Sequence, residues 1–119
     1  MPVSFYKFVK AYYRPKTYME HYLTKLERTI KNFWTRDALA NYKGDRFTFE
    51  DLAVNIEKFH IFFEAIGLKK GDKVALCAKN TARWAVSFLS INTFEAVVVP
   101  ILADFTPNSI NHLVDHSES

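Results

Sequence analysis

Apolar side chains recur at helical spacing in the first third of the chain. Thr17 and Glu20 form a capping-box pattern, and the apolar positions that follow stand three and four residues apart, at Leu23, Leu26, Ile30 and Phe33. This spacing predicts a helix over residues 18–33. Aromatic residues at similar spacing predict a shorter helix or turn over residues 3–13, which Pro15 ends because its ring cannot continue a helix.

A turn signal and a second helix signal follow. Residues 41–49 place a Gly-Asp pair between aromatic and β-favouring residues, a pattern typical of a two-stranded hairpin. Thr48 and Asp51 then form a capping box, and Gly67 supplies a left-handed stop. The apolar stripe between the cap and the stop consists of Leu52, Ile56, Phe59, Phe63 and Ile66. We therefore expect a long helix that begins after Thr48.

Two apolar runs are too short for helices and are bounded by turn residues. They are residues 73–78 (KVALCA) and the β-branched residues 96–102 (AVVVPIL), and each predicts a strand. Asn80 or Thr81 caps a predicted helix over residues 82–93, whose apolar side carries Trp84, Phe88 and Ile91. A last helix begins at Thr106-Pro107, with Ile110, Leu113 and Val114 as its apolar residues.

The order strand, helix, strand, helix predicts an α/β fold with a parallel sheet and right-handed crossovers. Because both strand runs are apolar throughout, we expect helices to cover them on both faces. The same alternation would require another strand directly after the last helix. We therefore expect an incomplete α/β unit.

Composition narrows the class of protein. The 119 residues are 49% hydrophobic and include 2 Trp, 6 Tyr and 11 Phe, so a packed core is expected and intrinsic disorder is not. Cys77 is the single cysteine, which excludes a disulfide framework and a cysteine zinc site and indicates a reducing, cytoplasmic compartment. No run approaches the roughly 18 apolar residues of a membrane span, and no signal peptide is recognisable.

Charge is unevenly distributed along the chain. Residues 1–36 carry eight Lys or Arg against two Glu, a net charge of +6, whereas residues 37–119 carry eight against eleven Asp or Glu, a net charge of −3. A solvated helix face over an acidic neighbour explains this asymmetry, and a membrane contact is the alternative. The aromatic residues Phe5, Phe8 and Tyr12 likewise favour docking onto the domain over insertion among lipids. We expect no nucleic-acid partner, because no strand carries a stacking array.

The chain lacks recognisable catalytic motifs. Its three glycines are scattered, so there is no phosphate-binding loop, and no G-x-S-x-G or H-E-x-x-H pattern occurs. His112 and His116 lie four residues apart, with Asp115 beside them, and could share a metal. A polar helix face is the favoured interpretation, and we predict no metal site and no catalytic residue. His60, which lies among aromatic and apolar residues, is expected at a core boundary.

Several motifs occur together in a characteristic order. These are FTFEDL, GLKKGDKVAL, the pair Asn80 and Trp84 in an N-x-x-x-W pattern, FEAVVVPI and INHLVDHSES. By these motifs, residues 42–119 resemble the opening segment of the adenylate-forming (AMP-binding) acyl-CoA synthetases. Residues 1–41 resemble the helical N-terminal extension of the long-chain fatty-acid CoA ligases in that superfamily. The chain departs from the family at Phe94-Glu95, where relatives carry glycine, so a less tight turn is expected there.

The resemblance implies an N-terminal fragment of an ATP-dependent ligase for a medium- or long-chain fatty acid. The parent enzyme would convert a carboxylate, ATP and CoA into acyl-CoA, AMP and pyrophosphate with Mg²⁺. The family's phosphate loop, adenine and magnesium motifs and adenylation lysine would follow residue 119. The fragment alone is therefore expected to bind no cofactor and to be inactive, with the remainder of the ligase chain as its partner.

Resemblance to acetyl-type relatives also implies a site. Leu102, Ala103 and Asp104, at the carboxyl end of the second predicted strand, would lie near the CoA nucleotide, although a plain strand-to-helix connection is an equal alternative. We further expect that the fragment self-associates through an open sheet edge and that a peripheral contact with the inner membrane surface is weak. The alternative function is a stand-alone interaction or membrane-surface module that uses the basic aromatic N-terminus.

Overall fold

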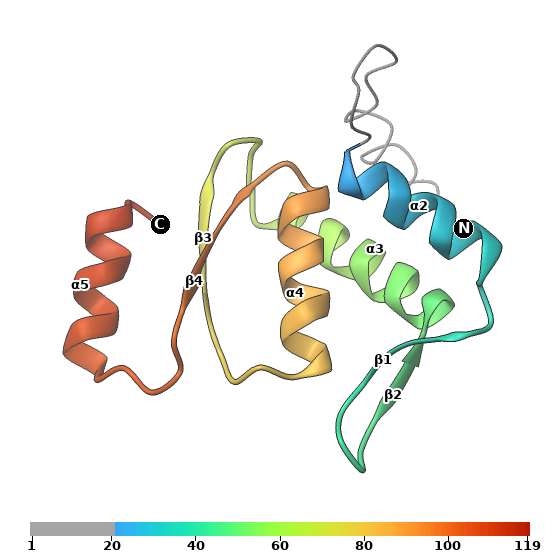
Figure 1. The fold of residues 1–119 in the computed structure, drawn as a ribbon. Coiled ribbons are helices and arrows are strands. Elements are labelled where there is room, and N and C mark those ends of the chain that lie inside the picture. The colour runs from blue at the N-terminus through green and yellow to red at the C-terminus, as the bar shows by residue number, and fades with distance from the viewer. Residues whose placement is uncertain (1–20) are drawn as a thin grey trace.

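The computed structural model describes residues 21–119, which form four helices and four strands (Figure 1). The elements are α2 (Tyr22–Asn32), β1 (Asp37–Ala40), β2 (Arg46–Thr48), α3 (Phe49–Ala65), β3 (Lys73–Cys77), α4 (Ala82–Thr93), β4 (Val97–Ile101) and α5 (Pro107–Ser117). The α/β fold class is confirmed. The predicted helix over residues 3–13 and the Thr17–Glu20 capping box lie outside the described residues.

The hairpin lies partly outside the predicted segment. β1 and β2 pair antiparallel, but β1 precedes residue 41 and pairs Ala40 with Arg46. Residues 41–45 are used by the connecting loop, in which the Asn41 amide donates to Asp45 O at 2.8 Å and the Gly44 amide donates to Asn41 O at 3.0 Å. The sequence pattern predicts both strands within residues 41–49 because it assumes a short turn at Gly44-Asp45. The connecting loop is longer than this turn, so β1 lies before residue 41.

α3 begins and ends as its sequence predicts. The Thr48 hydroxyl accepts from the Asp51 amide at 3.1 Å, and the Asp51 carboxylate accepts from the Thr48 amide at 2.9 Å. Gly67 follows the helix with φ +79°. Leu52 and Ile56 form the main core with Leu23 and Ile30 of α2 and Val86 of α4. Ile66, at the end of the predicted stripe, is 59% exposed instead.

α4 buries a different face from the one its aromatic residues predicted. Thr81 caps the helix, accepting from the Trp84 amide at 3.3 Å. The residues buried at this helix are mostly small, namely Ala82, Val86, Ser90, Ile91 and Thr93. Trp84 and Phe88 are only half-buried and stack on each other with ring centroids 5.3 Å apart. Small residues face α3 because they allow the two helices to approach closely.

His60 joins α3 to α4 in the interior rather than lying at a core boundary. The side chain is 1% exposed, and its Nε2 lies 3.1 Å from Ser90 O and 2.8 Å from Thr93 Oγ1. Because a carbonyl oxygen can only accept, Nε2 carries a proton and donates it to this pair of oxygens. Burial lowers the pKa of His60 to about 4, and the Ser90 carbonyl opposes this shift. The imidazole is therefore neutral at pH 7.

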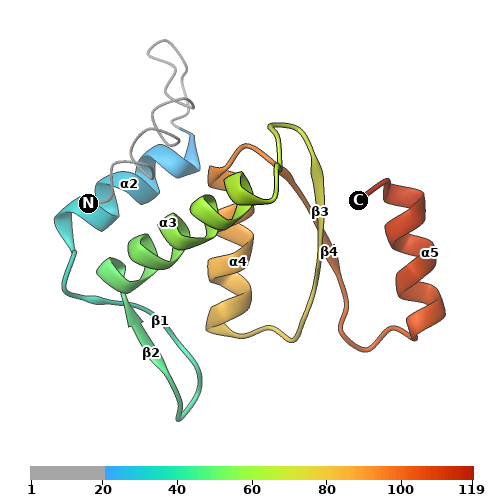
Figure 2. The same ribbon diagram turned by 180° about the vertical axis from the view of Figure 1, so that it is seen from behind.

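β3 and β4 pair in parallel, as predicted, with Lys73 opposite Val97 and Cys77 opposite Ile101. In Figures 1 and 2, α3 and α4 lie on one side of this pair and α5 lies on the other. Val74, Leu76 and Val98 pack against the cluster of Phe63, Ile91, Phe94 and Ala96. Most residues of the two strands are nevertheless only half-buried or exposed. Helix α5 lies on their other side but has no buried residue of its own, so it does not pack closely on the strands. Full coverage of both faces, as expected from the apolar runs, is not reached by residues 21–119.

The connection from α4 to β4 is tight although it lacks glycine. Glu95 adopts φ +67°, the Glu95 amide donates to Asn92 O at 3.0 Å, and the Ala96 amide donates to Ile91 O at 3.2 Å. These two bonds form the Schellman motif that usually carries glycine at the left-handed position. The expectation of a less tight turn is therefore wrong. The Glu95 carboxylate pairs with Lys70 Nζ at 3.0 Å, an interaction that glycine would not provide.

The backbone conformation of Glu95 predicts the effect of two substitutions. Glu95→Gly and Glu95→Ala both remove the ion pair with Lys70, but only glycine adopts positive φ without steric cost. We expect Glu95→Gly to be more stable than Glu95→Ala by about 1 kcal/mol in urea unfolding. Equal stability of the two variants would show that the left-handed conformation carries no cost at this position.

The buried imidazole of His60 predicts acid sensitivity. The unfolded chain binds a proton at His60 near pH 6.5, whereas the folded chain binds it only near pH 4. Stability is therefore unaffected by this group above pH 6.5 and falls as the pH drops, by about 3 kcal/mol at pH 4. His60→Gln retains a donor but cannot titrate, so its unfolding free energy should depend less steeply on pH over this range. His112→Gln, on the exposed helix α5, is the control and should keep the original slope.

Candidate functional site

A pocket of about 330 Å³ opens at the carboxyl ends of β3 and β4. Because the two strands are parallel and Cys77 lies opposite Ile101, the segments that follow them leave the sheet at the same edge. The pocket is lined by Ala78, Lys79, Asn80, Trp84, Pro100, Ile101, Leu102, Ala103 and Asp104. In an open α/β sheet this edge is where ligands are usually bound.

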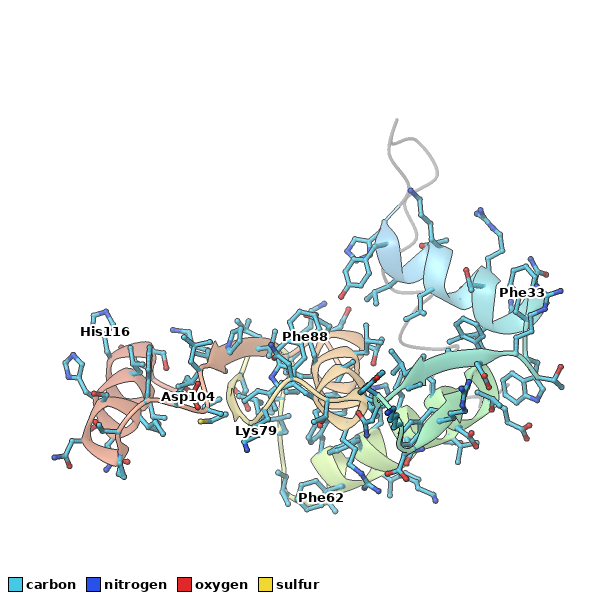
Figure 3. All side chains as sticks on the ribbon, turned by 60° about the horizontal axis from the view of Figure 1, so that its bottom comes forward. Phe33, Phe62, Lys79, Phe88, Asp104 and His116 are labelled. Atoms are coloured by element: carbon cyan, nitrogen blue, oxygen red, sulfur yellow. The ribbon has the colours of Figure 1, made fainter. Side chains whose placement is uncertain are left out.

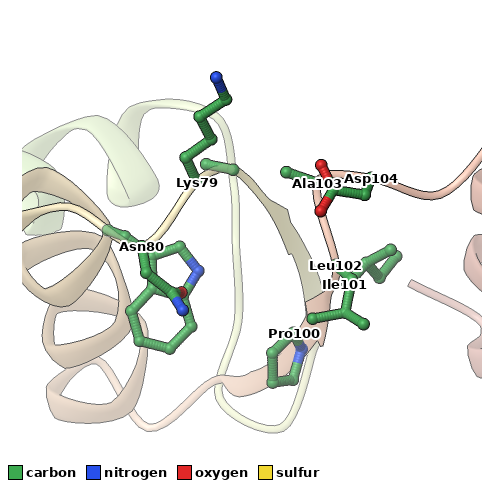
Figure 4. A pocket seen from close by; sticks show the side chains of 9 residues that line it. Lys79, Asn80, Pro100, Ile101, Leu102, Ala103 and Asp104 are labelled. Atoms are coloured by element: carbon green, nitrogen blue, oxygen red, sulfur yellow. The ribbon is translucent and has the colours of Figure 1, made fainter.

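The three residues expected near a nucleotide lie together in this lining. Leu102 is 65% exposed, and Ala103 and Asp104 are also exposed, so all three are accessible to a ligand. Figure 4 shows Asp104 on the segment after β4 and Lys79 on the segment after β3. Figure 3 places both side chains beside the strand pair, between α4 and α5.

Lys79 is not among the residues that the sequence singles out, and Asn80 stands out there only as a candidate helix cap and as part of a family motif. Both directly follow the predicted strand over residues 73–78. When two strands pair in parallel, the segments that follow them leave the sheet at the same edge. This rule, applied to the two predicted strands, could have identified Lys79 as a candidate site residue. Among the described residues, Lys79 forms no ion pair with Asp104, so the two charges are separately available to a ligand.

The first turn of α4, next to the pocket, is hydrogen-bonded to the loop between β1 and β2. Asn41 Oδ1 accepts from the Ala82 amide at 2.9 Å, across 41 positions of sequence. Together with the Thr81 hydroxyl, it satisfies amide donors in the first turn of α4, which carries Trp84 into the pocket. The Trp84–Phe88 stack fixes the indole further. The site therefore combines a rigid aromatic wall with polar groups on two loops.

The lining supplies binding groups rather than a reaction centre. Its polar side chains are one ammonium, one carboxamide and one carboxylate, at Lys79, Asn80 and Asp104, beside the apolar surface of Trp84 and Leu102. This set suits a ligand with a flat apolar part, hydrogen-bonding groups and an anionic part. The lining contains no serine or histidine, and its nearest thiol, at Cys77, lies 3.8 Å from Leu102 O.

The histidine pair lies elsewhere, on α5. The rings of His112 and His116 stack with centroids 6.1 Å apart, and Figure 3 shows His116 at the end of the molecule away from α2. Within residues 21–119, no group of three or more His, Cys, Asp or Glu is placed to hold a metal ion. In the same range, no helix is long and apolar enough to cross a bilayer.

Comparison with known proteins identifies the family. Residues 26–119 match the family described as AMP-binding enzyme. The chain belongs to the AMP-binding enzyme family. This match covers most of the chain and confirms the resemblance to adenylate-forming acyl-CoA synthetases.

Two curated relatives are CoA ligases. The long-chain-fatty-acid–CoA ligase of Escherichia coli O6:H1 is 28% identical over 92 residues, which are 76% of this chain and 16% of that protein. A 3-[(3aS,4S,7aS)-7a-methyl-1,5-dioxo-octahydro-1H-inden-4-yl]propanoyl:CoA ligase of Rhodococcus jostii is 28% identical over 95 residues, 79% of this chain and 18% of that protein. The chain thus spans about a sixth of the length of these relatives and corresponds to an N-terminal fragment of them.

Solved structures support the fold. The N-terminal subdomain of NpsA from Klebsiella oxytoca superposes with a TM-score of 0.71 at 19% identity, covering 79% of this chain and 24% of that one. A mutant form of coronafacic acid ligase from Pectobacterium brasiliense superposes with a TM-score of 0.75 at 18% identity, covering 81% of this chain and 19% of that one. Residues 21–119 therefore have the fold that begins the N-terminal subdomain of adenylation enzymes.

Proposed function

We propose that this chain is the N-terminal part of an ATP-dependent ligase that joins a fatty acid to CoA. The family match and the two CoA-ligase relatives support the reaction class. The name of the E. coli relative supports a long-chain acid as substrate. ATP, Mg²⁺ and CoA would be required by the complete enzyme, and the remainder of the ligase chain would be the partner of this segment.

The pocket at the ends of β3 and β4 is the proposed contact with the CoA nucleotide. The observation that carries this assignment is the meeting of Leu102, Ala103 and Asp104 with Lys79 and Asn80 in one cavity. CoA offers an adenine ring, ribose hydroxyls and several phosphate groups. The ammonium of Lys79 would attract the phosphates, and the apolar wall would contact the ring. The Asp104 carboxylate repels phosphate, so its role would be to accept from the adenine amino group or a ribose hydroxyl.

Lys79 provides a test of this assignment in a ligase chain that contains this segment. Removing a partly exposed cation next to phosphate costs on the order of 1 kcal/mol, so Lys79→Gln should raise KM for CoA about 5-fold. ATP–pyrophosphate exchange, which needs no CoA, should stay unchanged. Lys58→Gln, on the exposed side of α3, is the matched control and should alter neither rate. An equal loss in both half-reactions would refute the CoA assignment.

The chain of 119 residues is predicted to be inactive by itself. Adenylate formation needs charged donors and a metal around the transferring phosphate, and the polar groups of the described pocket are limited to Lys79, Asn80 and Asp104. The purified chain with ATP, Mg²⁺ and a series of fatty acids should give no pyrophosphate exchange above that of a heat-inactivated sample. Fatty-acid-dependent exchange above this background would contradict the prediction.

A further inference from the structure

One side chain of the β1–β2 loop is bonded to the start of α4. Ala82 is the first residue of this helix, so its amide has no acceptor within the helix itself. The carboxamide oxygen of Asn41 provides that acceptor at 2.9 Å. In Figures 1 and 2, the hairpin lies beside the end at which α4 begins. The hydrogen bond therefore ties the start of α4 to an element that is remote in sequence.

The hairpin holds Asn41 in place. The Asn41 amide donates to Asp45 O at 2.8 Å, and the Asn41 carbonyl accepts from the Gly44 amide at 3.0 Å. The pairing of Ala40 with Arg46 closes the loop directly outside these bonds. A Cβ at Gly44 would lie 3.2 Å from Asn41 Cβ, so the loop is closed tightly around Asn41. The position of the Asn41 side chain is therefore determined by the hairpin.

The same hydrogen bond fixes one end of a segment that lines the pocket. Residues 78–81 connect β3 to α4 and bring Lys79 and Asn80 into the lining. The first end of this segment is fixed because Cys77 is paired with β4, and the second end is fixed at the Ala82 amide. All four connecting residues are exposed, so little packing restrains them. The two ends therefore determine where the ammonium and the carboxamide of this segment lie.

We propose that Asn41 is a positioning residue for the CoA nucleotide, an inference that rests on the proposed function of the pocket. Asn41 is not part of the pocket lining, but it holds the segment with Lys79 and the first turn of α4 with Trp84. A ligand that contacts several groups binds more tightly when they are already placed for it, because less order has to be created on binding. Loss of the Asn41 bond should therefore weaken CoA binding.

Steady-state kinetics of a ligase chain that contains this segment test the proposal. Asn41→Ala removes the acceptor of one hydrogen bond, so KM for CoA should rise about 5-fold. ATP–pyrophosphate exchange, which needs no CoA, should stay unchanged. Asn41→Asp keeps an oxygen acceptor, and its negative charge suits a helix N-terminus, so KM should stay within about 2-fold of the original. The matched control is Tyr42→Ala, which truncates a neighbour that is 91% exposed and should alter neither reaction.

Hydrogen–deuterium exchange of the same proteins reports on the bond without CoA. Amides in a peptide that covers residues 80–88 should exchange faster in Asn41→Ala than in the original or in Asn41→Asp. A peptide from α3 should exchange at the original rate, which shows that the variant remains folded. Gly44→Ala keeps the carboxamide but presses a Cβ against Asn41. It should shift KM for CoA and the exchange rate in the same directions by smaller factors.

The outcomes separate this inference from the CoA assignment itself. The inference alone is overturned if Lys79→Gln raises KM for CoA and Asn41→Ala does not. It is also overturned if Asn41→Ala slows both half-reactions equally, as a purely structural role predicts, or if Asn41→Asp raises KM as much as Asn41→Ala. If neither Lys79→Gln nor Asn41→Ala changes KM while exchange at the start of α4 accelerates, the CoA assignment is wrong. The inference then falls with it, although the hydrogen bond is present.

Discussion

The parallel pairing of β3 with β4 determines where the binding groups of this chain meet. Hydrogen bonds between the strands hold Cys77 opposite Ile101, so the segments that follow both strands emerge at one edge of the sheet. A shift of the register by one residue would exchange the two faces of a strand and move Val98 away from Phe63 and Ile91. The apolar packing on one face thus fixes the register, and the parallel pairing brings the segment with Lys79 and the segment with Asp104 to the same pocket.

The packing of α3 on α4 forms the apolar surface against which β3 and β4 lie. Small buried residues on α4 allow close approach, and His60 of α3 donates to oxygens of Ser90 and Thr93 within that interface. The cost of burying an imidazole is offset because its Nε2 proton has two acceptors. The hydrogen bonds also make this contact specific. With an apolar residue at position 60, only the shapes of the packed side chains would determine the orientation of α3 relative to α4.

Residues 26–119 belong to the AMP-binding enzyme family, and the chain spans about a sixth of the length of its curated relatives. Strands β3 and β4 are half-buried and retain apolar surface that residues 21–119 do not cover. At the end of α4, Glu95 takes the left-handed position that glycine usually occupies in a Schellman motif, and it forms an ion pair with Lys70. A left-handed backbone conformation can therefore be adopted at a steric cost where the side chain provides a contact.

Local signals in the sequence determined the helix caps and the order of elements. Thr48, Thr81 and Thr106 each cap the helix that their position predicts, because a capping hydroxyl acts on amides only two or three residues away. The motifs also sufficed to identify the family and to single out Leu102, Ala103 and Asp104. Tertiary structure alone decided that α4 buries Ser90 and Thr93 while Trp84 stays half-exposed, that His60 is internal, and that Lys79 belongs to the pocket. These outcomes depend on partners more than 20 positions away in the chain, and periodicity within one element carries no information about which distant residue will be its neighbour.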